Sequence, residues 1–224
     1  MKLKDIKTLI TSGTIILAVG LYLLFAKPTD ERPLTNDSVL QQTTNDGSQN
    51  NTPSKEEKHY SITPELAMNE TGKQMIDVEF ISANDGDTMS VKMDGQKQRV
   101  RLLMIDTTEM NYGKGDPMPY AEEAKQLTTQ LLEDAKSIQL LFDKGPEKDK
   151  YDRLLAYVFV DGVSLHEVLL SEGLAAVRYV NKPNNSLEDE LRKIQQKAEA
   201  EKLNIWAHEN YLQKDGFHPE EVKK

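Results

Sequence analysis

Short apolar or alternating segments recur through the last two thirds of the chain. Residues in strict alternation predict half-buried strands, and brief apolar runs bounded by turn residues predict buried ones. Five segments fit these patterns, at residues 75–83, 88–93, 98–105, 137–142 and 154–160. Asp94-Gly95 and Asp161-Gly162 follow the second and the last of them, and such pairs favour hairpin turns.

Apolar residues recur at helical spacing in three further segments, at residues 119–136, 163–173 and 186–206. Ser186 is the expected N-cap of the last helix, and Gly173 ends the middle one. The strands follow one another in hairpins more than in a βαβ alternation. This order predicts an α+β domain with a small antiparallel barrel and helices packed against it.

The N-terminus has a different pattern. Three lysines precede residues 9–26, a stretch of 18 residues without charge, which is long enough to span a bilayer as a helix. Lysines before the span favour a cytoplasmic N-terminus and an exterior location for everything that follows. The sequence predicts a single-pass membrane anchor at residues 1–26. The alternative is a signal peptide, cleaved near the segment AVG, that leads to secretion.

Residues 27–73 are rich in Asn, Gln, Thr and Ser and poor in large apolar residues. Such a segment cannot bury enough apolar surface to offset the entropy of ordering, so a disordered linker is expected. Residues 74–208 are then the folded domain, and residues 209–224 are expected to form a polar, frayed tail.

Composition excludes several classes of site and partner. The chain has no cysteine, so disulfides and thiolate metal sites are ruled out, and its four histidines show no ligand spacing. The formal net charge of −9 argues against a protein that works by tight, non-catalytic binding of nucleic acid.

Carboxylates gather where predicted strands end. Asp85 and Asp87 flank a glycine before one strand, and Asp106 and Glu109 follow the end of another. A hairpin brings these ends together, and like charges at such proximity are costly unless a cation lies between them. Ligands that are all oxygen favour a hard ion, calcium or magnesium.

Two arginines accompany the carboxylates. Arg101 lies in the strand that leads to Asp106, and Arg153 stands at the start of the last strand. A metal ion with two guanidinium groups suits a phosphodiester, because all three stabilise the charge that grows on phosphoryl oxygens. Arg101 and Asp106 have opposite parity along a strand, so the strand must end, bulge or bend between them.

Five motifs in order, DGDT, RLLMIDTTE, FDKGPEKDKYDRLLAY, YVNKPNN and EKLNIW, resemble those of the staphylococcal nuclease (thermonuclease) family over residues 75–206. The resemblance implies an OB-type five-stranded Greek-key barrel with three helices. It also implies calcium-dependent hydrolysis of single- and double-stranded DNA and RNA to products with 3'-phosphate ends. A monomer without an obligate protein partner is expected, acting outside the cell.

The resemblance also implies roles for nine residues. The implied calcium ligands are the carboxylates of Asp87 and Asp106 and the backbone carbonyl of Thr107. The implied catalytic groups are Arg101 and Arg153, which hold the phosphate, and Glu109, the general base. The groups implied around the nucleotide phosphate and base are Lys150, Tyr151 and Tyr179.

Three positions depart from the family pattern. Thr108 replaces a proline before Glu109, Asp152 replaces a glycine before Arg153, and Asn181 replaces a tyrosine beside the base. A nuclease-like binding module that had lost catalysis would lack one or more of the five implied carboxylate and arginine groups. A calcium-stabilised structural module would need the carboxylates alone. Since all five groups are present, the sequence favours an active nuclease.

Overall fold

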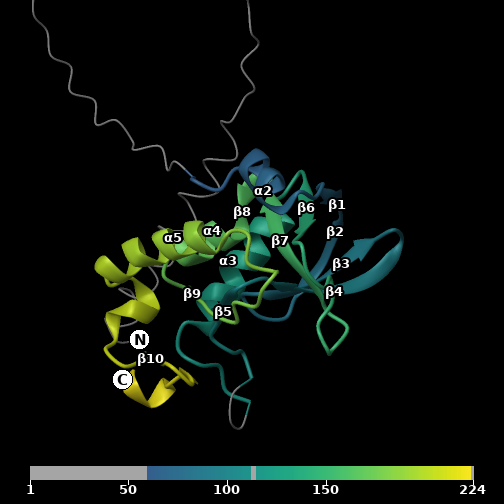
Figure 1. The fold of residues 1–224 in the computed structure, drawn as a ribbon. Coiled ribbons are helices and arrows are strands. Elements are labelled where there is room, and N and C mark those ends of the chain that lie inside the picture. The colour runs from purple at the N-terminus through teal and green to yellow at the C-terminus, as the bar shows by residue number, and fades with distance from the viewer. Residues whose placement is uncertain (1–59, 112–114, 223–224) are drawn as a thin grey trace, which may run out of the picture. The chain divides into compact units, whose positions relative to one another are not determined.

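The computed structural model describes residues 60–111 and 115–222 (Figure 1). The predicted anchor at residues 1–26 and the predicted linker as far as residue 59 lie outside the described residues. Within the part that is described, no helix is both long enough and apolar enough to span a bilayer. The described residues form one compact unit of mixed α and β structure.

The main sheet contains seven strands. They are β1 (Ile76–Asp77), β2 (Glu79–Ala83), β3 (Thr88–Met93), β4 (Gln96–Leu102), β6 (Ile138–Phe142), β7 (Leu154–Val160) and β8 (Val163–Ser164). Their order is β1-β6-β7-β4-β3-β2, with β8 paired to β7. The predicted strands are all present, but residues 75–83 divide into two, because β1 pairs with β6 while β2 pairs with β3.

One pair of strands corrects the prediction of a purely antiparallel sheet. β4 and β7 run parallel, with Val100 opposite Leu154. A parallel pair requires a long crossover. Here the chain between β4 and β7 supplies it, through β5 (Ile105–Thr107), α3 (Ala121–Glu133) and β6.

The chain bends between Arg101 and Asp106, as their opposite parity predicts. β4 ends at Leu102, and Met104 has a positive φ of 57° before β5 begins. β5 then leaves the main sheet and pairs antiparallel with β9 (Ala175–Val177), with Asp106 opposite Ala176. The bend allows Arg101 and Asp106 to face the same site.

The three predicted helices are confirmed as α3, α4 (Leu165–Ser171) and α5 (Glu188–Ala200). α4 packs against β7, α3 and α5 (Figure 1). The predicted cap of α5 is wrong: its N-cap residue is Leu187, and no side chain caps the helix. Ser186 instead donates from its hydroxyl to Asp143 Oδ1 at 2.6 Å, since that buried carboxylate needs donors.

A fourth helix, α2 (Pro64–Thr71), lies in the region expected to be linker. Thr63 caps it by accepting from Leu66 N, and Pro64 stands at its first turn, where a missing N–H costs nothing. Ahead of it, Ile62 is 1% exposed. Residues 60–73 therefore belong to the folded unit.

The C-terminal residues also differ from the expected frayed tail. They follow the 3-10 helix η1 (Asn204–Ala207) and form a hairpin of β10 (Leu212–Gln213) and β11 (Gly216–Phe217), then a second 3-10 helix, η2 (Pro219–Glu221). Tyr211 is fully buried with Ala176 and Ile205. Its hydroxyl donates to the carbonyl of Pro119 at 2.7 Å. One buried aromatic residue thus attaches the hairpin to the domain.

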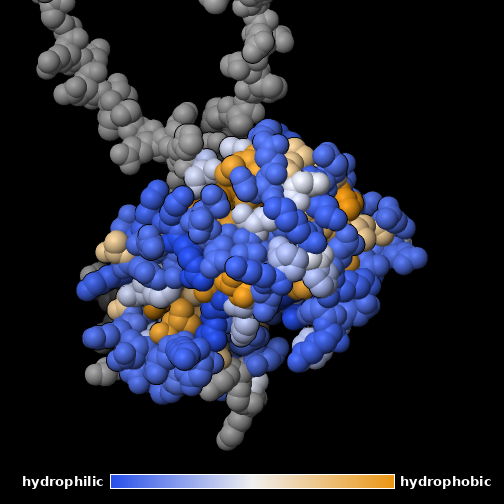
Figure 2. All heavy atoms as spheres, in the orientation of Figure 1, coloured by the Kyte–Doolittle hydropathy of each residue, from blue (hydrophilic) through white to orange (hydrophobic). Residues whose placement is uncertain are grey.

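The core lies beneath the main sheet, where β6 and β7 contribute side chains such as Leu140, Tyr157 and Phe159, none more than 1% exposed. The face shown in Figure 2 is largely hydrophilic, with smaller hydrophobic patches. Among the described residues only three large hydrophobic side chains are exposed: Ile81, Tyr151 and Tyr179. Two of these three are predicted substrate-binding residues.

Candidate active site

The turn between β2 and β3 carries Asp85 and Asp87. Asp85 Oδ1 accepts hydrogen bonds from the backbone N–H groups of Asp87 and Thr88, at 3.1 and 2.7 Å. Gly86 lies against α3 and β5, where an added Cβ would be 2.7 Å from Ala124 Cβ and 2.8 Å from Thr107 Cγ2. A glycine is therefore required here by lack of space, and the close approach buries Asp87 to 3% exposure.

β5 brings its polar groups to the same turn. Thr107 donates from its backbone N–H and its hydroxyl to Asp87 Oδ2, at 2.7 and 3.1 Å. Asp106, next along the strand, is buried as well. The structure thus joins Asp87, Asp106 and Thr107, while the role of the Thr107 carbonyl stays a prediction.

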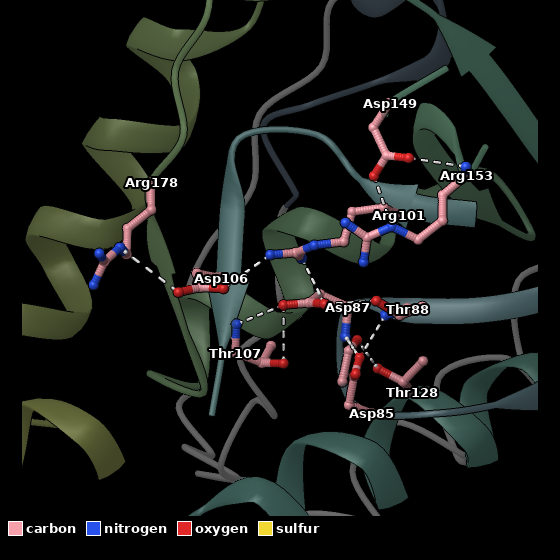
Figure 3. A network of polar contacts seen from close by, with 11 residues as sticks. Asp85, Asp87, Thr88, Arg101, Asp106, Thr107, Thr128, Asp149, Arg153 and Arg178 are labelled. Atoms are coloured by element: carbon pink, nitrogen blue, oxygen red, sulfur yellow. Dashed lines mark hydrogen bonds and ion pairs between the residues drawn. The ribbon is translucent and has the colours of Figure 1, made fainter. Parts of the chain in front are cut away.

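Arg101 lies between the two carboxylates (Figure 3). Its Nη1 is 2.5 Å from Asp87 Oδ1, and its Nη2 donates to Asp106 Oδ1 at 2.8 Å. The side chain is only 11% exposed. A largely buried guanidinium and two buried carboxylates form one charge network, in which the guanidinium stabilises the charge of both carboxylates.

Arg153 is positioned by the loop before β7. Asp149 Oδ2 accepts from Arg153 Nε at 2.7 Å, and Asp149 Oδ1 accepts from the backbone N–H of Arg153 at 2.9 Å. In Figure 3 Arg153 and Asp149 lie to one side of Arg101. Burial opposes ionisation of Asp149, but the hydrogen bonds from Arg153 outweigh it and lower the pKa of that carboxyl. Arg101 in β4 and Arg153 in the loop before β7 thus approach one region.

A cavity of about 830 Å³ lies in front of these groups. Seven of the nine predicted site residues line it: Arg101, Asp106, Glu109, Lys150, Tyr151, Arg153 and Tyr179. Tyr151 and Tyr179 are 58% and 61% exposed, so their rings are available to a ligand. Lys150 Nζ lies 4.9 Å from the centre of the Tyr151 ring. Cations and aromatic rings at the mouth of a cavity suit a phosphate joined to a base.

The carboxylates raise one another's pKa. Burial and the charge of Asp87 raise the pKa of Asp106 to about 6, although Arg101 and Arg178 oppose the shift. Burial and Asp87 also raise the pKa of Asp85 to about 7, and they raise that of Glu109. Burial disfavours charge on Arg101, but Asp87 and Asp106 outweigh it and raise its pKa. A cation among these carboxylates would relieve their repulsion.

The donors present fit a hard divalent ion. Asp87 and Asp106 offer buried carboxylate oxygens, which calcium prefers. Across residues 60–111 and 115–222, no group of three or more His, Cys, Asp or Glu side chains is arranged to hold a metal. Besides carboxylates, calcium commonly takes backbone carbonyls and water as ligands.

Comparison with known proteins gives the chain its family. A family model described as "Staphylococcal nuclease homologue" matches residues 99–208. Endonuclease YncB of Bacillus subtilis (strain 168) is 44% identical over 145 residues, which cover 65% of this chain and 68% of that protein. The chain belongs to the staphylococcal nuclease family.

Two other relatives of this nuclease-family chain differ in how much of them it covers. The SPbeta prophage-derived endonuclease YokF of the same strain is 46% identical over 145 residues, 65% of this chain but only 49% of that protein. The thermonuclease of Staphylococcus hyicus is 36% identical over 130 residues, 58% of this chain and 75% of that protein. The chain thus spans about half the length of YokF and about two thirds or more of the length of YncB and of the thermonuclease.

In this member of the family, the three departures have visible local consequences. Thr108 is fully buried, and its hydroxyl has no hydrogen-bond partner. Asp152 keeps a positive φ of 62°, a conformation that suits glycine, and pairs with Lys148 at 2.7 Å. Asn181 donates to the carbonyl of Tyr179 at 2.9 Å. None of the three displaces a predicted site residue from the cavity or from the Asp87 network.

Sequence reasoning missed three residues that shape the site. Asp149 holds Arg153, Arg99 Nη2 donates to the carbonyl of Tyr151 at 2.7 Å, and Arg178 Nε lies 3.6 Å from Asp106 Oδ2. Asp149 stands within a quoted motif and Arg178 directly precedes another, but nothing in their spacing shows which charged group they meet. Arg99 lies two residues before Arg101 and therefore faces the same side of the strand, which was the only sign in the sequence that it lies near the site.

Proposed function

We propose that this chain is a calcium-dependent nuclease that hydrolyses phosphodiester bonds of DNA and RNA, single- or double-stranded, and leaves 3'-phosphate ends. The observation that carries the proposal is the convergence of Arg101, Arg153 and Glu109 on one cavity beside the buried pair Asp87 and Asp106. Membership of a family whose named relatives include endonucleases supports it.

The residues divide the chemistry among them. Arg101 and Arg153 donate to the non-bridging oxygens of the phosphate and stabilise the charge that develops there. Glu109 accepts a proton from water as the water oxygen attacks phosphorus, and its raised pKa makes it a stronger base. The bond from phosphorus to the 5'-oxygen then breaks, and that oxygen takes up a proton to become a hydroxyl.

Calcium held by Asp87, Asp106 and the Thr107 carbonyl would act as a Lewis acid on the phosphate oxygens. Lys150, Tyr151 and Tyr179 would bind the substrate through phosphate contact and base stacking. In this proposal the cavity residues orient the scissile phosphate, and the two tyrosines fix the nucleotide beside it.

The remaining parts of the proposal concern architecture and location. The sheet, its helices and the family relationship support an OB-type barrel for the nuclease domain. The uncharged N-terminal stretch supports a membrane anchor, with the domain held outside the cell by the linker, or secretion after cleavage. The protein would act as a monomer without an obligate partner.

The test uses the intact chain with single-stranded DNA, duplex DNA and RNA, with added calcium or with excess chelator. Arg153→Ala and Glu109→Gln remove one proposed group each. Arg192→Ala is the matched control, because Arg192 is exposed on α5 and pairs only with Glu188 among the contacts described for it. The measurements are kcat and KM, and the ends of the products are identified by their sensitivity to phosphatase.

We expect cleavage that requires calcium, leaves 3'-phosphates and falls about 100-fold or more in either site variant, since a lost transition-state donor costs this much. Arg192→Ala should match the wild type. A folded chain that binds DNA and calcium but cleaves nothing would overturn the proposal and leave a catalytically impaired binding module.

A further inference from the structure

A third arginine borders the proposed cation site. Arg178 directly follows β9, and its backbone N–H donates to the carbonyl of Met104 at 2.8 Å. This bond continues the β5–β9 ladder in which Asp106 lies opposite Ala176. Figure 3 shows the Asp106 carboxylate between Arg178 on one side and Arg101 on the other. Arg178 Nε is 3.6 Å from Asp106 Oδ2, with side chains 16% and 9% exposed.

The position of Arg178 is enclosed by its neighbours. Its guanidinium carbon lies 5.3 Å from the centre of the Tyr179 ring. Its Nη1 is buried and has no hydrogen-bond partner. A Cβ placed on Gly216, in the C-terminal hairpin, would be 3.8 Å from that nitrogen. The Arg178 side chain is therefore only 16% exposed and lies next to the hairpin, so bulk water screens its charge from Asp106 weakly.

Two guanidinium groups lie against Asp106 before any metal binds. Arg101 and Arg178 are each within ion-pair distance of its carboxylate, at 2.8 and 3.6 Å. A divalent ion that binds beside Asp106 must approach a fixed guanidinium and weaken its ion pair. At separations of a few ångströms in a partly buried site, such repulsion changes affinity by at least about 10-fold.

We propose that Arg178 sets the cation affinity of this site by competing with calcium for Asp106. The inference rests on the proposed function, because it assumes the cation site formed by Asp87 and Asp106. Arg178 does not line the cavity, so it acts on the cation through Asp106 and makes no contact with the phosphate. A protein with this residue needs more calcium for activity than one with a neutral side chain there.

The experiment measures calcium affinity by calorimetry in the intact chain without nucleic acid. Arg178→Met removes the charge and keeps an unbranched stem beneath the hairpin, while Arg178→Lys keeps the charge. Arg178→Gln is a second neutral variant in case Met impairs folding. Arg192→Met removes an equal charge from the exposed pair with Glu188 and serves as the control.

We expect the neutral variants to bind calcium about 10-fold more tightly than the wild type, with Arg178→Lys and Arg192→Met within about twofold. The calcium concentration for half-maximal cleavage should fall by the same factor. Unchanged or weaker binding in both neutral variants, beside a wild type that binds calcium and cleaves DNA, overturns this inference alone. A wild type that neither binds calcium nor cleaves DNA overturns the proposed function, and the inference with it.

Discussion

At the scale of single residues, the direction of the Arg153 side chain depends on one carboxylate, that of Asp149. Asp149 accepts from both the backbone and the guanidinium of Arg153, so it fixes the direction of the side chain as well as the turn before it. Side chains that position a catalytic group within a fraction of an ångström have large effects on rate without touching the substrate. In the proposed mechanism, Asp149 is a positioning residue of this kind.

Asp149→Ala should lower kcat about 100-fold, because Arg153 loses its only described carboxylate partner and its fixed direction. The double variant Asp149→Ala/Arg153→Ala should be no slower than Arg153→Ala alone, since the two side chains act together. Steady-state kinetics on single-stranded DNA measure both effects. Glu147→Ala, an exposed change in the same loop, is the control. Additive losses in the double variant would show that Asp149 acts by another route.

The sequence predicted the side chains that line the site, but it did not predict the residues that contact and orient them. The ends of predicted strands were enough to group Asp87 with Asp106, and Arg101 lies in the strand that leads to Asp106. The opposite parity of Arg101 and Asp106 predicted the bend between them. Asp149 and Arg178 could not be assigned a partner in the same way. Their contacts depend on the shape of a loop and on the pairing of β5 with β9, which involve residues far apart along the chain.

At the scale of elements, one helix holds the start of the folded unit. Glu167, in α4, is 5% exposed. Its Oε1 accepts from the backbone N–H and the hydroxyl of Ser61 at 2.7 and 2.8 Å, and its Oε2 accepts from Ile62 N at 2.7 Å. More than a hundred residues separate these partners, so the sequence could not show that residues 60–73 leave the linker and pack.

Glu167→Ala should lower the free energy of unfolding by about 2–4 kcal/mol, because the partly buried N–H groups of Ser61 and Ile62 lose their acceptor. Denaturant unfolding measures the change, and amide exchange at both residues should accelerate. Glu65→Ala, an exposed change in the same N-terminal segment, should alter stability by less than about 0.5 kcal/mol. If both variants unfold alike, the anchoring role of Glu167 is wrong.

At the scale of the whole molecule, a buried histidine couples stability to pH. His166 is fully buried beside Tyr157, with ring centroids 5.4 Å apart, and burial lowers its pKa from 6.5 to about 3. Between these two values the unfolded chain binds a proton that the folded chain does not. Folding is therefore disfavoured as pH falls below 6.5.

His166→Gln should reveal this contribution in unfolding measured from pH 4 to pH 7. The wild type should lose about 1.4 kcal/mol per pH unit relative to the variant below pH 6, and the curves should become parallel above pH 7. His218→Gln should show the opposite pH dependence, because hydrogen bonds to Asp215 and Glu220 raise the pKa of His218. The wild type should gain stability relative to that variant as pH falls. Parallel curves for wild type and His166→Gln throughout would exclude a buried neutral imidazole.

The bend at Met104 also limits how this segment can evolve. Arg101 and Asp106 meet only because the chain changes direction once between them, at a residue with positive φ. Substitutions among the four intervening residues alter packing but leave the two ends in reach of each other. The gain or loss of a single residue would turn Asp106 to the other face of β5 and separate it from the guanidinium. We therefore expect relatives to differ in the amino acids between the positions of Arg101 and Asp106, while the number of residues between them stays at four.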